Sequence, residues 1–221
     1  LAGGVWYPQG GIYRIAEAMR DLAVSCGVAI HTSSPVASIV VEDGAARGVQ
    51  LADGTRHPAA AVISNVDVAT TYHKLLPPLA HVTRRAKRLA QRETSCSGFV
   101  LMLGVEGVHD ELAHHNIFFT EDYRREFDDI FGKGIPPADP TLYVAITSKT
   151  DTTHAPPGCE NWFVLVNAPP LSIRYNWAQN AADYRAHVYK ALAHAGYDLA
   201  GRVRSERMLT PVDLERMSGA W

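Results

Sequence analysis

The sequence predicts a mixed fold, with an α/β region followed by a longer α+β region. An amphipathic helix near the start precedes short apolar runs that are separated by Asp-Gly pairs. The apolar run at residues 60–65 then has the pattern of a strand buried on both faces. Two helical segments, several strand-like runs and a long helix follow, the order of an inserted α+β domain. We therefore expect one domain at residues 1–66 and a second, truncated at its C-terminus, at residues 67–221.

The first region is predicted to contain one helix and a β-meander. From Ile12 the apolar residues recur with helical spacing, and Gly27 can cap the C-terminal end. Asp43-Gly44 and Asp53-Gly54 lie between short apolar runs. Asp-Gly is a strong hairpin signal, because the turn needs residues that tolerate positive φ. The predicted strands are residues 28–30, 36–42, 47–51, 55–57 and 60–65.

The second region is predicted to alternate between helices and strands. Asp67 can cap a helix that ends before Pro77-Pro78. Three further helices are predicted at residues 79–92, at residues 180–195 and from Pro211 onward. The predicted strands are residues 96–105, 116–120, 142–147, 161–168 and 202–208.

Composition excludes several classes of protein. The formal net charge of −2 gives no electrostatic basis for broad nucleic-acid binding. The three cysteines form no CxxC pair, so neither a disulfide framework nor a zinc knuckle is expected. No apolar run approaches the length of a membrane span, and no signal peptide is recognisable. Because the chain also lacks an initiator Met, we interpret it as an internal piece of a longer protein.

The double glycine Gly10-Gly11 does not fit a phosphate-binding loop. Such a loop needs the G-x-G-x-x-G spacing between a strand and a helix, and no apolar strand precedes these glycines. One interpretation is a tight turn before the helix. The other is a backbone that must approach a bulky planar ligand closely.

Histidines at the start of the second region do not predict a metal centre. Glu106-x-x-His109 and Glu111-x-x-His114 match the E-x-x-H pattern, but they lie five residues apart between predicted strands, and the first contains a glycine. We expect a polar loop and no metal site, with His114-His115 as a pair that could line a ligand cavity.

Three other features allow a structural and a functional interpretation. Ser64-Asn65 ends the predicted buried strand, where ligands gather in open sheets, although a helix cap is the more common role for such residues. The basic helix at residues 79–92 is either a solvated face or a membrane-surface helix. The aromatic residues on the predicted strands are either core or the walls of an apolar cavity.

Several blocks of the chain resemble bacterial-type phytoene desaturases, which are FAD-dependent and related to the amine-oxidase flavoproteins. The similarity runs nearly from end to end, and the later blocks are specific to the carotenoid branch. The blocks are GVWYPQGG (residues 4–11), LADG (51–54), AVISNVD (61–67), LAHHNI (112–117), FDDIF (127–131), residues 150–159 and LTPVDL (209–214).

This resemblance implies FAD as cofactor and a Rossmann-like FAD-binding domain that is only partly present. Val36 matches the position whose backbone contacts the adenine in related flavoproteins, and Ser64-Asn65 is carried over as a second cofactor-binding position. Tyr7, the Gly10-Gly11 turn and His114-His115 are implied as substrate-binding. No catalytic side chain is carried over, because the flavin itself accepts the hydride.

The resemblance further implies the central portion of a carotenoid desaturase, in which hydride leaves a C–C bond of a long polyene. The alternatives are a carotene isomerase, a later-pathway dehydrogenase of the same group, a generic amine oxidase relative, or a non-enzymatic module that binds apolar ligands. The implied partner is an apolar polyene, and the implied location is cytoplasmic and peripheral to a membrane. We expect the 221-residue chain alone to be inactive and to bind FAD poorly.

Overall fold

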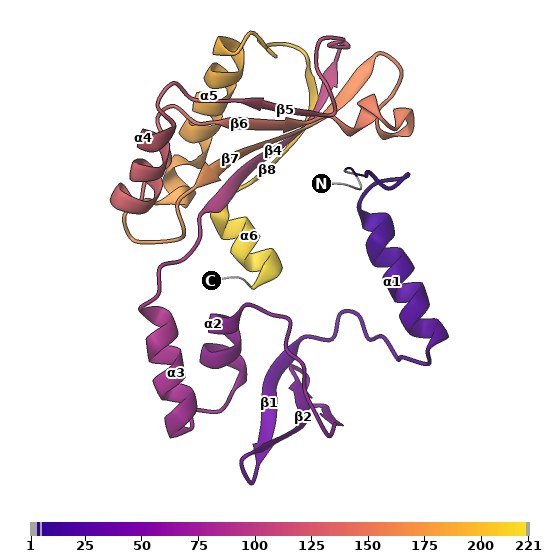
Figure 1. The fold of residues 1–221 in the computed structure, drawn as a ribbon, viewed down its shortest axis with the longest axis vertical. Helices are drawn as coiled ribbons and strands as arrows, with labels where there is room; N and C mark the ends of the chain where they lie inside the picture. Colours follow the sequence, from indigo (N-terminus) through magenta and orange to yellow (C-terminus); the bar gives the residue numbers. More distant parts are fainter. Residues whose placement is uncertain (1–3, 5, 220–221) are drawn as a thin grey trace. The chain divides into compact units, whose positions relative to one another are not determined.

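The structure is a computed structural model that describes residue 4 and residues 6–219, and in it the chain forms two compact units (Figure 1). The sheet unit contains the chain up to Arg14 together with Thr94–Leu214. The meander unit contains Ile15–Glu93 and the residues from Glu215 onward. These units divide the chain at other positions than the boundary between residues 66 and 67, and the domain assignment remains a prediction.

The sheet unit is built on a five-stranded antiparallel sheet in the order β5-β6-β7-β4-β8. The long strands β4 and β7 pair along their whole length, from Ser97 opposite Ala168 to Glu106 opposite Cys159. The strands are β4 (Ser97–Glu106), β5 (His115–Phe118), β6 (Leu142–Ala145), β7 (Cys159–Ala168) and β8 (Val203–Leu209). All five predicted strands of this region are thus present, with shifted ends.

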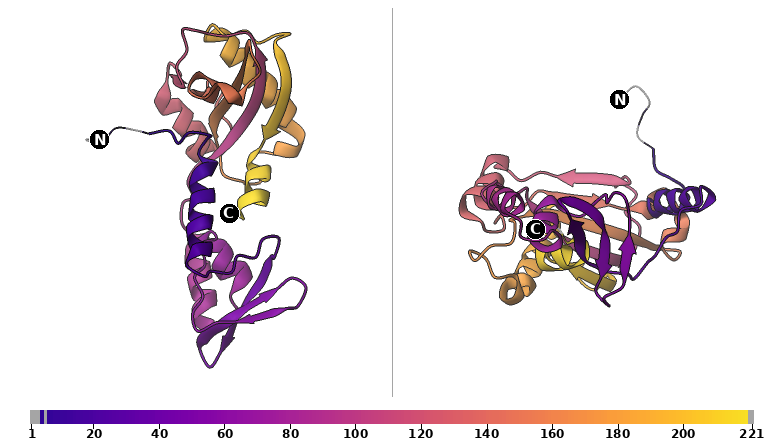
Figure 2. Two further views of the ribbon diagram at one scale, coloured as in Figure 1. Left: turned by 90° about the vertical axis from the view of Figure 1, so that its right-hand side faces the viewer. Right: turned by 90° about the horizontal axis from the view of Figure 1, so that it is seen from below.

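One face of this sheet is covered by the long helix α5 (Trp177–His194), as Figure 2 also shows. Side chains of a strand alternate between the two faces, and β7 alternates strictly between buried and half-buried residues. The buried positions pack against the helix and form the core of the unit. They are Phe99, Leu101, Leu103, Val105, Val144, Trp162, Val164 and Val166 on the sheet, with Trp177, Tyr184, Val188 and Leu192 on α5.

Short helical segments connect the strands of the sheet unit. The sequence did not predict α4 and η2, although Tyr123, Phe127 and Phe131 follow one another at intervals of four residues and their rings are in contact. Charged residues between them obscure the apolar pattern. The segments are α4 (Tyr123–Phe127), η2 (Asp128–Lys133), η3 (Thr147–Lys149) and η4 (Thr152–His154), and α6 (Pro211–Ser218) follows β8.

The meander unit contains the predicted β-meander. Asp43 and Gly44 both have positive φ, 50° and 74°, as the tight hairpin turn requires. Asp67 caps the next helix, since its carboxylate accepts from the amides of Ala69 and Thr70. The elements are α1 (Tyr13–Ser25), which starts at the boundary between the units, β1 (Val36–Glu42), β2 (Ala45–Leu51), β3 (Arg56–Pro58), α2 (Val68–Thr70), η1 (Thr71–Leu75) and α3 (Ala80–Ala90).

Two predicted strands, residues 28–30 and 60–65, are wrong. Both segments lack strand structure, and Ile63 in the second is 95% exposed. A strand needs a neighbour to pair with its backbone, and no strand in the described part of the chain pairs with either segment. All strand pairs among residue 4 and residues 6–219 are antiparallel, so the parallel sheet of a Rossmann-like domain is not seen there.

Candidate functional site

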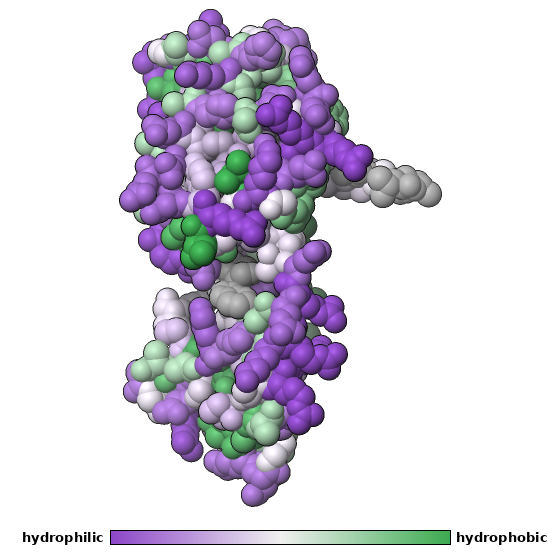
Figure 3. Space-filling model, turned by 90° about the vertical axis from the view of Figure 1, so that its left-hand side faces the viewer, coloured by the Kyte–Doolittle hydropathy of each residue, from purple (hydrophilic) through white to green (hydrophobic). Residues whose placement is uncertain are grey.

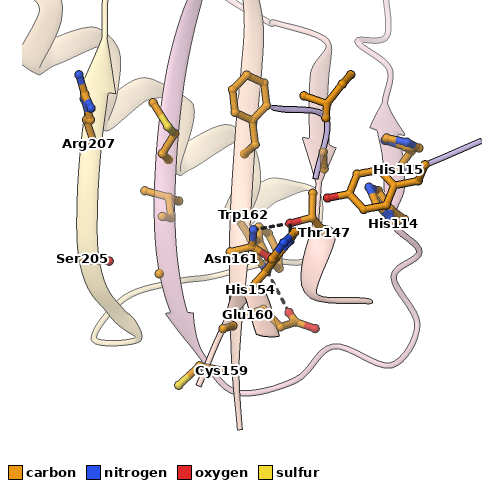
Figure 4. Close-up of a pocket in the computed structure, with 18 of the residues that line it drawn as sticks. His114, His115, Thr147, His154, Cys159, Glu160, Asn161, Trp162, Ser205 and Arg207 are labelled. Atoms are coloured by element: carbon orange, nitrogen blue, oxygen red, sulfur yellow. Dashed lines mark hydrogen bonds between the residues drawn. The ribbon is translucent and has the colours of Figure 1, made fainter. Parts of the chain in front are cut away.

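A cavity of about 1120 Å³ in the sheet unit lies on the sheet face opposite α5 (Figure 4). Its walls come from β4, β6, β7 and β8, from the loops that join them, and from the N-terminal segment around Tyr7. This volume reaches beyond the usual range for drug-sized ligands, so the cavity can hold a large molecule.

The floor of the cavity is one row of side chains across all five strands. Strand pairing places Phe163 of β7 opposite both Ala145 of β6 and Met102 of β4. The same row continues to His115 on β5 and to Arg207 on β8. Four strand spacings of about 4.8 Å give the row a length of about 19 Å. The floor is therefore apolar in its middle and polar at both ends.

A hydrogen-bonded network of polar side chains lines one wall of the cavity (Figure 4). Asn161 donates to the hydroxyl of Thr147 at 2.6 Å, and this hydroxyl lies 2.8 Å from Nδ1 of His154. The side-chain carbonyl of Asn161 accepts from the backbone amide of Ser148 at 2.8 Å. The network fixes η3 and η4 against β7, so this wall is formed by groups whose hydrogen bonds are already made.

The predicted double-glycine turn packs against the same wall. Gly10 and Gly11 have φ of +82° and +94°, and the Gly11 amide donates to the Pro8 carbonyl at 3.0 Å. The Gly10 amide donates to the Asp151 carboxylate at 3.2 Å. A Cβ on Gly11 would lie 3.6 Å from the Tyr7 hydroxyl. The structure thus shows a tight turn that holds the N-terminal segment over the cavity.

Tyr7, His114 and His115, all predicted as substrate-binding, lie together at the cavity. The Tyr7 ring is 4.6 Å from the ring of His114, which is 4.3 Å from that of His115. Burial lowers the pKa of His114, and the neighbouring His115 and His154 rings lower it further. The imidazole of His114 is therefore neutral near pH 7. The glycines of the turn position this group without lining the cavity themselves.

A buried carboxylate beside the cavity escaped the sequence analysis. Glu160 is 2% exposed, and its oxygens accept from Lys149 at 2.6 Å, from the Trp162 indole at 2.9 Å and from His109 Nδ1 at 2.8 Å. Burial acts to raise the pKa of Glu160, but hydrogen bonds from Lys149, Trp162 and His109 outweigh it and lower this pKa to about 2. A single Glu near the start of a strand carries no local signal of these partners, since Lys149 and His109 lie far from it in the sequence.

The Glu and His residues of the E-x-x-H motifs contact different parts of the protein. His109 binds Glu160, whereas Glu106 pairs with Arg204 on β8. His114 lies at the cavity, 2.6 Å from the hydroxyl of Thr150. Glu106, His109 and His114 thus each have a partner from a distant segment.

The three residues predicted to bind the cofactor belong to the meander unit. Val36 begins β1 and is 39% exposed. The Ser64 hydroxyl lies 2.8 Å from that of Thr71, and Asn65 follows on the exposed segment that lacks strand structure. No described contact tests their role in cofactor binding, which stays a prediction.

Curated relatives match nearly the whole chain. It is 37% identical to a 4,4'-diaponeurosporene oxygenase of Staphylococcus haemolyticus over 98% of this chain and 43% of that protein. It is 37% identical to a zeta-carotene-forming phytoene desaturase of Myxococcus xanthus, covering 96% and 41%. A 4,4'-diapolycopene oxygenase of a Methylomonas species is 38% identical, covering 96% and 42%. The chain thus spans about two fifths of the length of these relatives.

Solved structures share the fold at low sequence identity. An oxidoreductase from Methanosarcina mazei superposes with a TM-score of 0.62 and 20% identity, over 91% of this chain and 42% of that one. Reduced UDP-galactopyranose mutase superposes with a TM-score of 0.57 and 14% identity, over 92% and 39%.

A comparison with protein families also relates this chain to flavin-dependent oxidoreductases. Residues 1–132 match the family described as flavin containing amine oxidoreductase. The predicted resemblance is confirmed at this level, and the expected flavin and oxidoreductase class agree with it. The chain therefore belongs to the flavin-containing amine oxidoreductase family.

Proposed function

We propose that the protein carrying this chain is an FAD-dependent oxidoreductase that acts on long polyenes of the carotenoid type. The observation that carries the proposal is the cavity of about 1120 Å³, whose floor is apolar in the middle and extends for about 19 Å. A narrow strip of apolar side chains across a sheet suits an elongated apolar chain. The relatives named as carotenoid desaturase and oxygenases support this class of substrate.

The residues of this chain would bind and orient the polyene. Phe163, Met102 and Ala145 supply the apolar contact, and Trp6 and Tyr7 of the N-terminal segment would shield the ligand from water. FAD, when bound, supplies the acceptor for the hydride. Val36 and the segment around Ser64-Asn65 fit a role in holding it, because these residues are exposed. This assignment includes the proposal that the meander unit is part of a Rossmann-like domain, with the second region inserted into it.

Phytoene-type desaturation is the reaction we favour, and oxygenation at a polyene end is the second candidate because two relatives carry that name. Isomerisation of a carotene, later dehydrogenation and non-enzymatic binding of an apolar ligand are the remaining alternatives. The test uses protein from the complete reading frame, reconstituted with FAD and mixed with a hydrocarbon polyene in liposomes.

The products separate these alternatives. Absorption bands that grow at longer wavelength indicate desaturation, and a gain of oxygen mass indicates oxygenation. Geometric isomers without net oxidation indicate an isomerase. Protein that binds the polyene but takes up no FAD would overturn the enzymatic proposal in favour of a binding module. The 221-residue chain by itself is expected to bind FAD poorly, and stoichiometric flavin on it would contradict that expectation.

We further propose a cytoplasmic location with peripheral attachment to a membrane. No helix in the described ranges is both long and apolar enough to span one. Hydrophilic residues cover most of the face drawn in Figure 3. The basic side chains of α3, such as Arg84, Arg85 and Arg88, are exposed and could contact anionic lipids. Co-sedimentation with anionic vesicles should fall when these three arginines are replaced by alanine, and unchanged co-sedimentation would contradict a role of α3.

A further inference from the structure

Hydrogen-bonding groups are unevenly distributed around the cavity. The middle of the floor, Phe163, Met102 and Ala145, offers none. The edge at β5 presents the imidazoles of His114 and His115 and the phenol of Tyr143. A hydrocarbon could not form hydrogen bonds with the polar groups of this edge. The edge is therefore suited to a ligand whose end group is polar.

Both imidazoles at this edge have one nitrogen fixed by the protein and one available. The Tyr143 hydroxyl lies 2.8 Å from Nδ1 of His115, and the Thr150 hydroxyl lies 2.6 Å from Nδ1 of His114. When a hydroxyl donates to Nδ1 of an imidazole, the N–H of that ring resides on Nε2. Neither Nε2 has a protein partner within residue 4 and residues 6–219. Each ring can therefore donate an N–H to a ligand.

The charge of the edge selects the kind of ligand oxygen. Burial lowers the pKa of His114, with further lowering by His115 and His154, and burial raises the pKa of Tyr143. His114 and Tyr143 are thus uncharged at neutral pH. A neutral donor such as the His114 imidazole suits a hydroxyl, aldehyde or ketone oxygen, whereas a carboxylate would favour a cationic partner.

We propose that His114 and His115 bind the oxygen of a polyene end group, with Tyr143 orienting His115, so that the preferred ligand is a linear polyene with a neutral terminal oxygen function. This inference rests on the proposed function. The apolar part of the ligand lies along the row from β8 to β5, and its oxygenated end reaches His115, at the end of that row.

The test compares two ligands that differ only in the end group. Protein from the complete reading frame is titrated, in one detergent, with a linear hydrocarbon polyene and with its terminal alcohol, and visible absorption reports binding. We expect the alcohol to bind about five- to tenfold more tightly, the gain from one well-made hydrogen bond. His115→Phe and Tyr143→Phe should each abolish this preference, so that each variant binds the alcohol and the hydrocarbon with equal affinity.

The outcomes distinguish failure of the end-group inference from failure of the proposed function. Equal affinity of the wild-type protein for both ligands would overturn the end-group inference while the proposed function stands. No binding of either polyene would overturn both. A variant that loses both ligands equally would overturn the assignment of the edge. His81→Phe, an exposed histidine on α3, is the matched control and should keep the preference.

Discussion

The sheet unit and the meander unit differ in how much of their apolar surface they bury. The sheet unit has a continuous core between five strands and α5, with Leu101, Val144 and Val166 fully buried. In the meander unit, α1 has no buried residue. The buried apolar residues of that unit, within the described ranges, are Ile39, Ala69, Val82 and Ala86. Since a fully buried large apolar side chain contributes about 1.5–3 kcal/mol, the stability of the two units must come from different sources.

This difference indicates where substitutions will matter. The sheet unit depends on side chains, including the buried carboxylate of Glu160, and it contains the cavity. The meander unit depends more on its backbone, that is, on tight turns and on strand pairs that approach closely. Side-chain substitutions should therefore cause the largest losses of stability in the sheet unit, and substitutions of glycine should cause the largest losses in the meander unit.

The largest effect is expected for Glu160→Gln in the sheet unit. The substitution removes the negative charge that compensates Lys149 and leaves donors of Trp162 and His109 competing for one carbonyl oxygen. Breaking such a buried pair costs about 3 kcal/mol or more. Chemical denaturation of the protein should show this loss, and the exposed Glu121→Gln is the control. A loss near zero would mean that the sheet unit does not depend on this cluster.

The pH dependence of the same variant sharpens this test. The pKa of Glu160 falls from its ordinary 4.5 to about 2 on folding. A carboxylate with a lowered pKa stabilises the folded state fully above its unfolded value and progressively less as the pH falls toward 2. The stability difference between wild type and Glu160→Gln should thus shrink from pH 5 to pH 3. A difference that stays constant over this range would contradict the role of the charge.

In the meander unit, Gly48→Ala should be the most damaging change. Gly48 has φ of +140°, and an added Cβ would lie 2.1 Å from the carbonyl oxygen of His57 on β3. Strain and clash together should cost about 2–3 kcal/mol and separate β3 from β2. Hydrogen exchange at the β2 amides measures this.

The matched control lies in the turn of the same meander. Gly44 also has positive φ, +74°, but nothing lies within 4 Å of an added Cβ. Gly44→Ala should therefore cost only the backbone strain, about 1 kcal/mol. If the two substitutions reduced stability equally, the close approach of β2 and β3 would not determine the stability of this unit.

The sequence predicted local structure well where the signal was local. The Asp43-Gly44 turn, the Asp67 cap and all five strands of the larger sheet follow from spacing and turn chemistry. The strand predicted at residues 60–65 is absent, because an apolar run indicates burial but does not specify a neighbouring strand to pair with.

The candidate site was predictable only in part, for the same reason. The resemblance singled out Tyr7 and His114-His115, which the structure places at one cavity. The partners of Glu160 could not be found from sequence, because Lys149 and His109 reach it from separate loops. Likewise, the row through Phe163 and Met102 exists only once the strand register is known.

A smaller effect is expected when the cavity itself is narrowed. Gly104 lines the cavity two residues along β4 from Met102, and an added Cβ there would be 2.5 Å from the Ser205 hydroxyl, which can rotate away. Gly104→Val should thus keep the fold but project methyl groups into the cavity, and polyene affinity should fall about tenfold, or about 1.4 kcal/mol.

The control for this change is on the same strand and face. A Cβ on Gly98 would meet Leu165 and Leu214 at ordinary distances of 3.6–3.8 Å, outside the cavity. Gly98→Ala should therefore leave polyene affinity unchanged. If Gly104→Val binds the polyene as the wild type does, the ligand does not occupy the part of the cavity next to Gly104.

The smallest effect is expected for Val36→Ala in the meander unit. Val36 is proposed to contact the adenine of FAD through its backbone, and its side chain is already 39% exposed. Removing two methyl groups there should change FAD affinity less than about twofold, because little buried apolar area is lost. Val36→Pro, which lacks the backbone N–H, should weaken FAD binding if that group makes the contact. Flavin fluorescence titration of the complete protein measures both. A large loss in the alanine variant would show that the meander unit, like the sheet unit, acts through its side chains.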